Sequence, residues 1–169
     1  MASTSLSAPA GPSGADERLV SQLADPGSRE LVLGGSLYFA ALRALLLARR
    51  GEIAKEDIAN EIVWELESIA ADLIKEACNI NVVEFENIKY DIKILINKFI
   101  IDLFRNIRKN AIINLGDLLD EAYRYGRMIM GSRVVPLFDV LVGAAWLDEE
   151  VLRDQHEALV GLVREKVCG

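Results

Sequence analysis

Apolar residues recur every three or four positions along most of the chain, in long segments separated by glycine, proline or asparagine. This spacing is typical of amphipathic α-helices, and no repeat at the period of a solenoid appears. The sequence therefore predicts an all-α fold, a compact bundle of about six helices around a central hydrophobic helix. The expected helices run over residues 16–24, 29–50, 54–78, 82–109, 115–130, a segment ending near 146, and 149–167.

The segment 29–50 is apolar on nearly every face, which is typical of a buried central helix. Ser28 is the expected N-cap of this helix. Gly34 and Gly35 either weaken the helix or allow a neighbouring element to approach it closely. We therefore expect residues 29–50 to lie inside the bundle.

Helix starts are also predicted further along the chain. Asn81 and Glu84 have the spacing of a capping box, and Asn114 precedes the helix expected at 115–130. Asp148 is the expected cap of the last helix. The helix over 82–109 has a wide apolar face, formed by Phe85, Ile88, Ile92, Leu95, Ile96, Phe99, Leu103 and Phe104.

The chain has 169 residues, which suits one domain. Residues 1–15 are rich in serine, alanine, proline and glycine, so they predict a flexible tail, and residues 16–169 predict a single helical domain. The formal charge of −7 makes a phosphate backbone an unfavourable partner, and we expect no nucleic acid binding. The basic residues gather at expected helix ends, where they complement the helix dipole: Arg49, Arg50, Arg105, Arg108 and Lys109.

Two cysteines, Cys78 and Cys168, form no CxxC motif and match no zinc spacing. A reduced intracellular compartment is the simplest context, with Cys78 as a small buried hydrophobe. Residues 31–48 approach the length of a membrane span but carry Arg43 near the centre, and residues 134–147 contain an aspartate. Both segments are expected to be buried core helices in a cytoplasmic protein.

The sequence contains no recognisable motif of catalytic residues. His156 is the single histidine, and no ExxH pattern of a di-iron bundle precedes it. The chain has no GxSxG nucleophile elbow, and Gly34–Gly35 is not part of a phosphate-binding loop. We therefore expect a non-enzymatic protein without a metal or cofactor, whose function is interaction with other proteins.

The stretch DEAYRYGRMIMGSR, residues 120–133, places Gly126 and Arg127 inside an expected helix. Three segments, one of which contains this pair, together resemble the Bcl family of apoptosis regulators. SRELVLGGSLYFAALRALLLARRG (28–51) resembles the family's N-terminal motif, and EIVWELESIAADL (61–73) resembles its death helix. YRYGRMI (123–129) resembles the motif whose core is a Gly-Arg pair after an aromatic residue.

In the death-helix-like segment, Ile62, Leu66, Ile69 and Leu73 have the motif's anchor spacing of 4, 3 and 4. The resemblance implies a groove that binds amphipathic death-motif helices of partner proteins, and an inhibitory role in apoptosis. It also implies that the Gly-Arg pair begins the central helix beside that groove. The family's tail anchor is absent, so the expected location is the cytoplasm or the mitochondrial surface.

The residues that the resemblance assigns to the groove have different roles. Arg127 would pair with an acidic residue of the incoming helix, and Gly126 would let the ligand backbone approach. The apolar walls and the aromatic position before the glycine would be formed by Leu119, Tyr123, Tyr125, Phe99 and Phe104.

Two alternatives remain open from the sequence. The domain could be a helical adaptor or assembly subunit unrelated to apoptosis, with an oligomeric state that the sequence leaves open. It could also be a membrane-active helical protein, with 31–48 and 134–147 as inserting elements and peripheral contact with a membrane.

Overall fold

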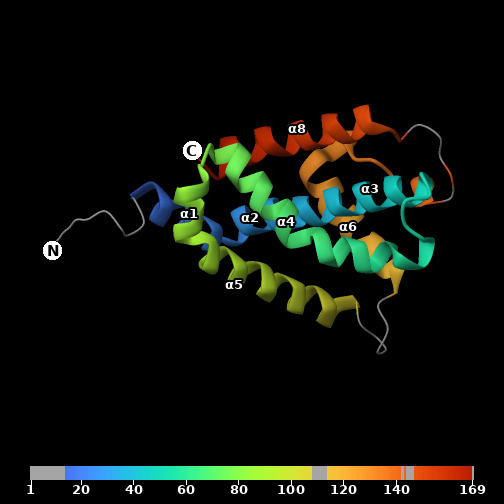
Figure 1. Cartoon of the computed structure of the whole chain (residues 1–169), viewed down its shortest axis with the longest axis horizontal. Coiled ribbons are helices and arrows are strands. Elements are labelled where there is room, and N and C mark those ends of the chain that lie inside the picture. Colours follow the sequence, from blue (N-terminus) through green and yellow to red (C-terminus); the bar gives the residue numbers. More distant parts are fainter. Residues whose placement is uncertain (1–13, 108–113, 142, 144–146, 169) are drawn as a thin grey trace.

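A computed structural model describes residues 14–107, 114–141, 143 and 147–168 of the chain (Figure 1). Within these ranges the regular elements are all helical and no strand is present, which confirms the all-α prediction. Of the tail expected over residues 1–15, residues 1–13 lie outside the described residues, and residues 14 and 15 are already the first residues of a helix. Arg108 and Lys109 also lie outside the described residues.

The helices follow the expected order with small differences in their bounds. They are α1 (Gly14–Ala24), α2 (Pro26–Arg29), the π-helical turn η1 (Glu30–Gly34), α3 (Gly35–Arg49), the 3-10 turn η2 (Lys55–Asp57), α4 (Ile58–Cys78), α5 (Val82–Ile107), α6 (Leu115–Met130), the 3-10 turn η3 (Gly131–Arg133), α7 (Leu137–Leu141) and α8 (Glu149–Lys166). The segment expected to run to about 146 is therefore much shorter as a helix, and residues 144–146 lie outside the described residues.

Three of these elements, α2, η1 and α3, form one continuous helix from Pro26 to Arg49. The helices α4, α6, α7 and α8 pack around α3, which lies in the middle of the molecule (Figure 1). Most side chains from Leu31 to Leu46 are buried, as expected for a central helix. Among the described residues, only this helix is long and apolar enough to cross a membrane, and 78% of its most apolar window is buried inside the protein.

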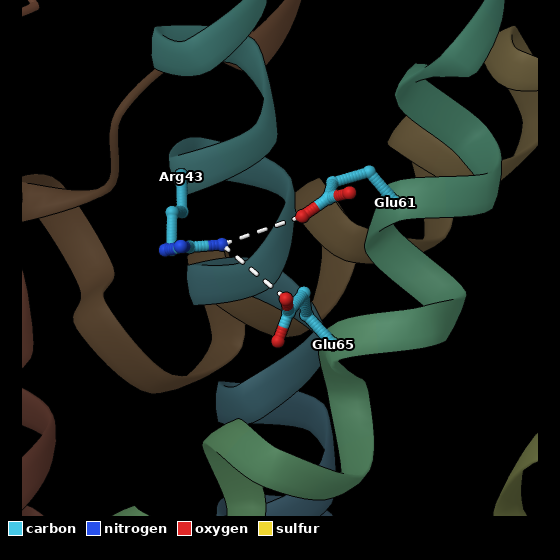
Figure 2. Close-up of polar contacts among 3 residues, drawn as sticks. All are labelled: Arg43, Glu61 and Glu65. Carbon is cyan, nitrogen blue, oxygen red and sulfur yellow. Dashed lines mark hydrogen bonds and ion pairs between the residues drawn. The ribbon is translucent and has the colours of Figure 1, made fainter. Parts of the chain in front are cut away.

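Arg43 is the charged residue in the centre of this helix, and two glutamates of α4 compensate its charge. The guanidinium Nη1 lies 3.5 Å from Glu61 Oε2 and 3.9 Å from Glu65 Oε1 (Figure 2). The Arg43 side chain is 39% exposed, so solvent screens the pairs and each contributes at most about 1 kcal/mol. Arg43 thus lies at the edge of the α3–α4 contact and is not buried in the core.

The expected helix starts are largely confirmed by hydrogen bonds. Asn81 Oδ1 accepts from Glu84 N at 2.8 Å while Glu84 Oε1 accepts from Asn81 N at 3.2 Å, which completes the capping box. Asn114 and Asp148 cap α6 and α8. The prediction for Ser28 was wrong: Asp25 is the N-cap and accepts from Ser28 N, because Pro26 fits the first helical position.

The prediction of free cysteines was also wrong. Cys78 at the end of α4 and Cys168 after α8 form a disulfide, with a Cα–Cα distance of 5.1 Å. The two residues are 90 positions apart and come together only because α4 and α8 pack side by side. This pairing removes the argument for a reduced compartment, since disulfides persist in oxidising surroundings.

Candidate functional site

The central helix and α6 cross at two reciprocal contacts between a glycine and a tyrosine ring. A Cβ atom on Gly34 would lie within 3.0 Å of ring atoms of Tyr125 in α6. A Cβ atom on Gly126 in α6 would overlap in the same way with the ring of Tyr38 in α3. Each helix therefore supplies a glycine where the other supplies a ring, and the two backbones come close together.

This crossing corrects the role expected for Gly126. The residue is buried, and its open side is filled by Tyr38 of the same chain. It is therefore a contact point between helices and is not open to the backbone of a ligand. Gly126 also lies just before the last turn of α6, so the Gly-Arg pair is near the end of a peripheral helix and does not begin the central one.

Tyr38 is fully buried, and its hydroxyl joins three parts of the fold. The hydroxyl donates to Gln155 Oε1 in α8 at 2.6 Å and accepts from Val135 N at 2.8 Å. Gln155 Nε2 in turn donates to Arg133 O at 3.1 Å. This network fixes the Tyr38 ring against Gly126, because the ring is held at its far end by two hydrogen bonds.

Burial raises the pKa of the Tyr38 hydroxyl from 10.0 to about 12, partly offset by the hydrogen bond from Val135 N. The folded state thus holds this proton more tightly than the unfolded state. The associated stability is fully present below pH 10 and is lost as the pH rises through the interval from 10 to about 12. The total loss over this interval is about 2–3 kcal/mol.

We expect a Tyr38→Phe variant to lack this pH dependence. At neutral pH it loses about 1–3 kcal/mol, because Gln155 Oε1 and Val135 N are left without their partner. Urea unfolding of both proteins at several pH values between 10 and 12 measures the difference. Parallel loss of stability in wild type and variant over this range would show that Tyr38 is not the titrating group.

Arg127 lies on the outer face of α6 and is exposed. In the part of the chain that the structure describes, no carboxylate lies within ion-pair distance of its guanidinium. The neighbouring Arg124 differs: its guanidinium pairs with Glu121 Oε2 at 2.9 Å and stacks on the Tyr125 ring at 4.4 Å. Arg127 is therefore the arginine in this segment that can bind an external acidic group.

An open hollow of about 640 Å³, which we call the hollow beside Arg127, lies where the ends of α6 and α8 meet the turn between α1 and the central helix. Arg127 precedes the lining residue Met128 in α6 but does not itself line the hollow. Its apolar lining comes from Leu31, Met128, Ile129 and Leu162, and Met128 is 56% exposed. Its polar rim is mixed in charge, with Asp25 and Glu30 on the central-helix side and Lys166 on α8. A hollow of this size and composition suits the binding of apolar side chains from a partner.

The residues expected to form a groove do not line this hollow. Leu119 is fully buried, and Tyr123 and Phe104 are partly buried against the core. Phe99 and Tyr125 are brought together, with ring centroids 5.7 Å apart, but they line a separate small hollow of about 110 Å³ between α5 and α6. None of the five residues expected to form the groove walls therefore lines the hollow of about 640 Å³.

The four death-helix-like residues lie on α4 and face the interior. Ile62, Leu66 and Leu73 are buried and Ile69 is partly buried. In this conformation they stabilise the α4 contacts with the central helix and α8, and they are not presented to a partner.

A second open hollow, of about 420 Å³, lies between α4 and α5. Its lining includes Phe85, Ile92, Lys75 and Trp64, whose side chain is 81% exposed. Trp64 lies outside the apolar stripe that faces the interior from α4, and it was not among the candidate residues expected from the sequence. This hollow is the second candidate for a binding site on the described surface.

The described residues contain no group of three or more histidine, cysteine or acidic side chains that could hold a metal ion. His156 is partly buried, with Nε2 3.5 Å from Glu76 Oε2 and its ring 5.2 Å from the Phe39 ring. Comparison with protein-family models, with curated proteins and with solved structures gives no match to this chain.

Proposed function

We propose that this protein is a non-enzymatic interaction domain that binds an amphipathic helix of a partner protein in the hollow beside Arg127. The observation that supports this most directly is an open apolar hollow at the end of α6, lined in part by the helical turn that also carries an exposed arginine without an ion pair among the described residues. Arg127 immediately precedes Met128, which lines the hollow.

The lining matches what an amphipathic helix needs. Its apolar residues, spaced three or four apart, would contact Leu31, Met128, Ile129 and Leu162, and each fully buried side chain contributes about 1.5–3 kcal/mol before ordering costs. Methionine suits such a surface because its side chain adapts to different partners.

The charges around the hollow would set the orientation of the bound helix. An acidic residue of the partner is favourable beside Arg127 or Lys166 and unfavourable beside Asp25 and Glu30. A basic residue has the opposite preference. Such complementarity contributes more to specificity and to the choice of register than to affinity.

The resemblance of residues 28–51, 61–73 and 123–129 to the Bcl family supports a narrower proposal. The partner helices would be death-motif helices, and sequestering them would inhibit apoptosis. The acidic residue of the death motif would then be the group that pairs with Arg127.

The test is an isothermal titration calorimetry experiment in which death-motif helix peptides are added to the protein. We expect Arg127→Glu to weaken binding by about 10- to 100-fold, because attraction to the peptide's acidic residue becomes repulsion. Helicity should not change, since Arg127 is exposed and forms no ion pair among the described residues. The loss of stability should be at most about 1 kcal/mol, because Arg127 lies in the last turn of α6, where a cation is favourable. Arg153→Glu on α8 is the matched control, because Arg153 is also exposed and lies near the opposite end of α8 from Leu162 and Lys166, which line the hollow.

Two results would refute this proposal. The first is wild-type protein that binds none of these peptides. The second is a peptide that binds wild type, Arg127→Glu and Arg153→Glu with the same affinity, because the site would then lie elsewhere.

A further inference from the structure

The long helix α5 lies along one edge of the molecule, packed against α1 and α4 (Figure 1). Its inner face carries the buried residues Phe85, Ile88, Ile92 and Ile96. Its outer face also carries large apolar residues, and several are strongly exposed: Val83, Tyr90, Ile94 and Ile101 are 75%, 73%, 49% and 57% exposed. An ordinary solvent-facing helix surface would be polar at these positions.

These outer residues belong to one regular stripe. With Asn87 and Asn97 they occupy every position of an alternating 4-3 spacing from residue 83 to residue 101, which is the spacing of a coiled-coil seam. The stripe spans about 27 Å of helix. An asparagine within such a seam is a known device for fixing the register between two helices.

The charges beside the stripe indicate what binds there. Along one flank the order is Glu84, Asp91, Lys98 and Arg105, so the first half of this flank is acidic and its second half is basic. Asp91 and Lys98 form no ion pair among the described residues. Glu84 also accepts from Asn81 N, and Arg105 lies 3.5 Å from the exposed Asp102.

We propose that two copies of this chain associate through the outer face of α5, with the two helices antiparallel about a two-fold axis near Ile94. Such an axis places each flank of α5 against the same flank of the second copy. Asp91 then faces the partner's Lys98, and Glu84 faces the partner's Arg105. The same register brings Tyr90 against the partner's Ile101.

A parallel arrangement of the two helices is disfavoured by the same charges. In a parallel pair, each flank meets the opposite flank of the second helix, five residues further along. Glu86 would face the partner's Asp91, and Lys93 would face the partner's Lys98. Both contacts are between like charges, so the charge order selects a second copy in the antiparallel direction.

The test is sedimentation equilibrium of the full chain over a range of protein concentrations. We expect a concentration-dependent species with twice the 18.7 kDa mass of one chain. Lys98→Asp should raise the dissociation constant about tenfold, because two symmetry-related contacts change from attraction to repulsion. The double variant Asp91→Lys/Lys98→Asp should restore association, since it exchanges the two charges.

Lys55→Asp is the control for the change in net charge, because Lys55 is exposed and lies outside α5. Circular dichroism verifies that each variant remains folded. A wild type that stays monomeric at every concentration would overturn the proposal. This also holds if the outer face of α5 is then found to bind lipid vesicles. Association that Lys98→Asp leaves unchanged or strengthens would overturn the antiparallel arrangement.

Discussion

Reduction of the Cys78–Cys168 disulfide is expected to lower the free energy of unfolding by about 4–5 kcal/mol. The bond closes a loop of 90 residues, and a cross-link of that span removes much of the conformational entropy of the unfolded chain. It joins the ends of α4 and α8, where Arg164 Nε also donates to Ala77 O at 3.1 Å. A loss of this size is comparable to a large part of the total stability of a typical domain.

The measurement is urea unfolding of the protein with and without a thiol reductant. A Cys78→Ala/Cys168→Ala variant is the control, because it should have the stability of the reduced protein and should not respond to reductant. If the reductant leaves the unfolding midpoint of the wild type unchanged, the two cysteines are not bonded in solution.

Gly126→Ala is expected to destabilise the protein by about 1–3 kcal/mol, although alanine is the better helix former. The new methyl group would overlap with the Tyr38 ring, and two hydrogen bonds at the Tyr38 hydroxyl prevent the ring from moving away. Overpacking of this kind in a close-packed core typically costs that amount.

Gly161 in α8 provides a matched control, because it is exposed and a Cβ atom there would meet no atom within 4 Å. Gly161→Ala should therefore stabilise the helix by up to about 1 kcal/mol. Thermal and urea unfolding of the two variants should shift in opposite directions. Equal shifts would mean that Gly126 does not mark a close contact between helices.

The sequence predicted the elements whose limits are set by local chemistry. The bounds of α6 follow from the Asn114 cap and from Gly131, and the capping box at Asn81 marks the start of α5. The central position of the segment around α3 follows from its apolar surface. The start of this helix was placed wrongly because Asp25 and Pro26 together are a stronger start signal than Ser28.

Features that depend on tertiary packing could not be predicted in this way. The hollow beside Arg127 combines Leu31, Met128 and Leu162 from three separate helices, and no local pattern relates them. The disulfide between Cys78 and Cys168 also joins residues that are 90 positions apart and that no local pattern relates. Gly126 was expected to contact a ligand, but it contacts Tyr38 of the same chain. A sequence shows that a glycine permits a close contact, but it does not show which group makes that contact.

The most direct test of the proposed function is a map of backbone amide chemical shifts during titration with a death-motif helix peptide. We expect the largest changes to cluster around Leu31, Arg127, Met128, Ile129 and Leu162, and we expect Arg127→Glu to remove them. Changes that cluster around Trp64 and the α4–α5 hollow, or no changes at all, would contradict the proposed function.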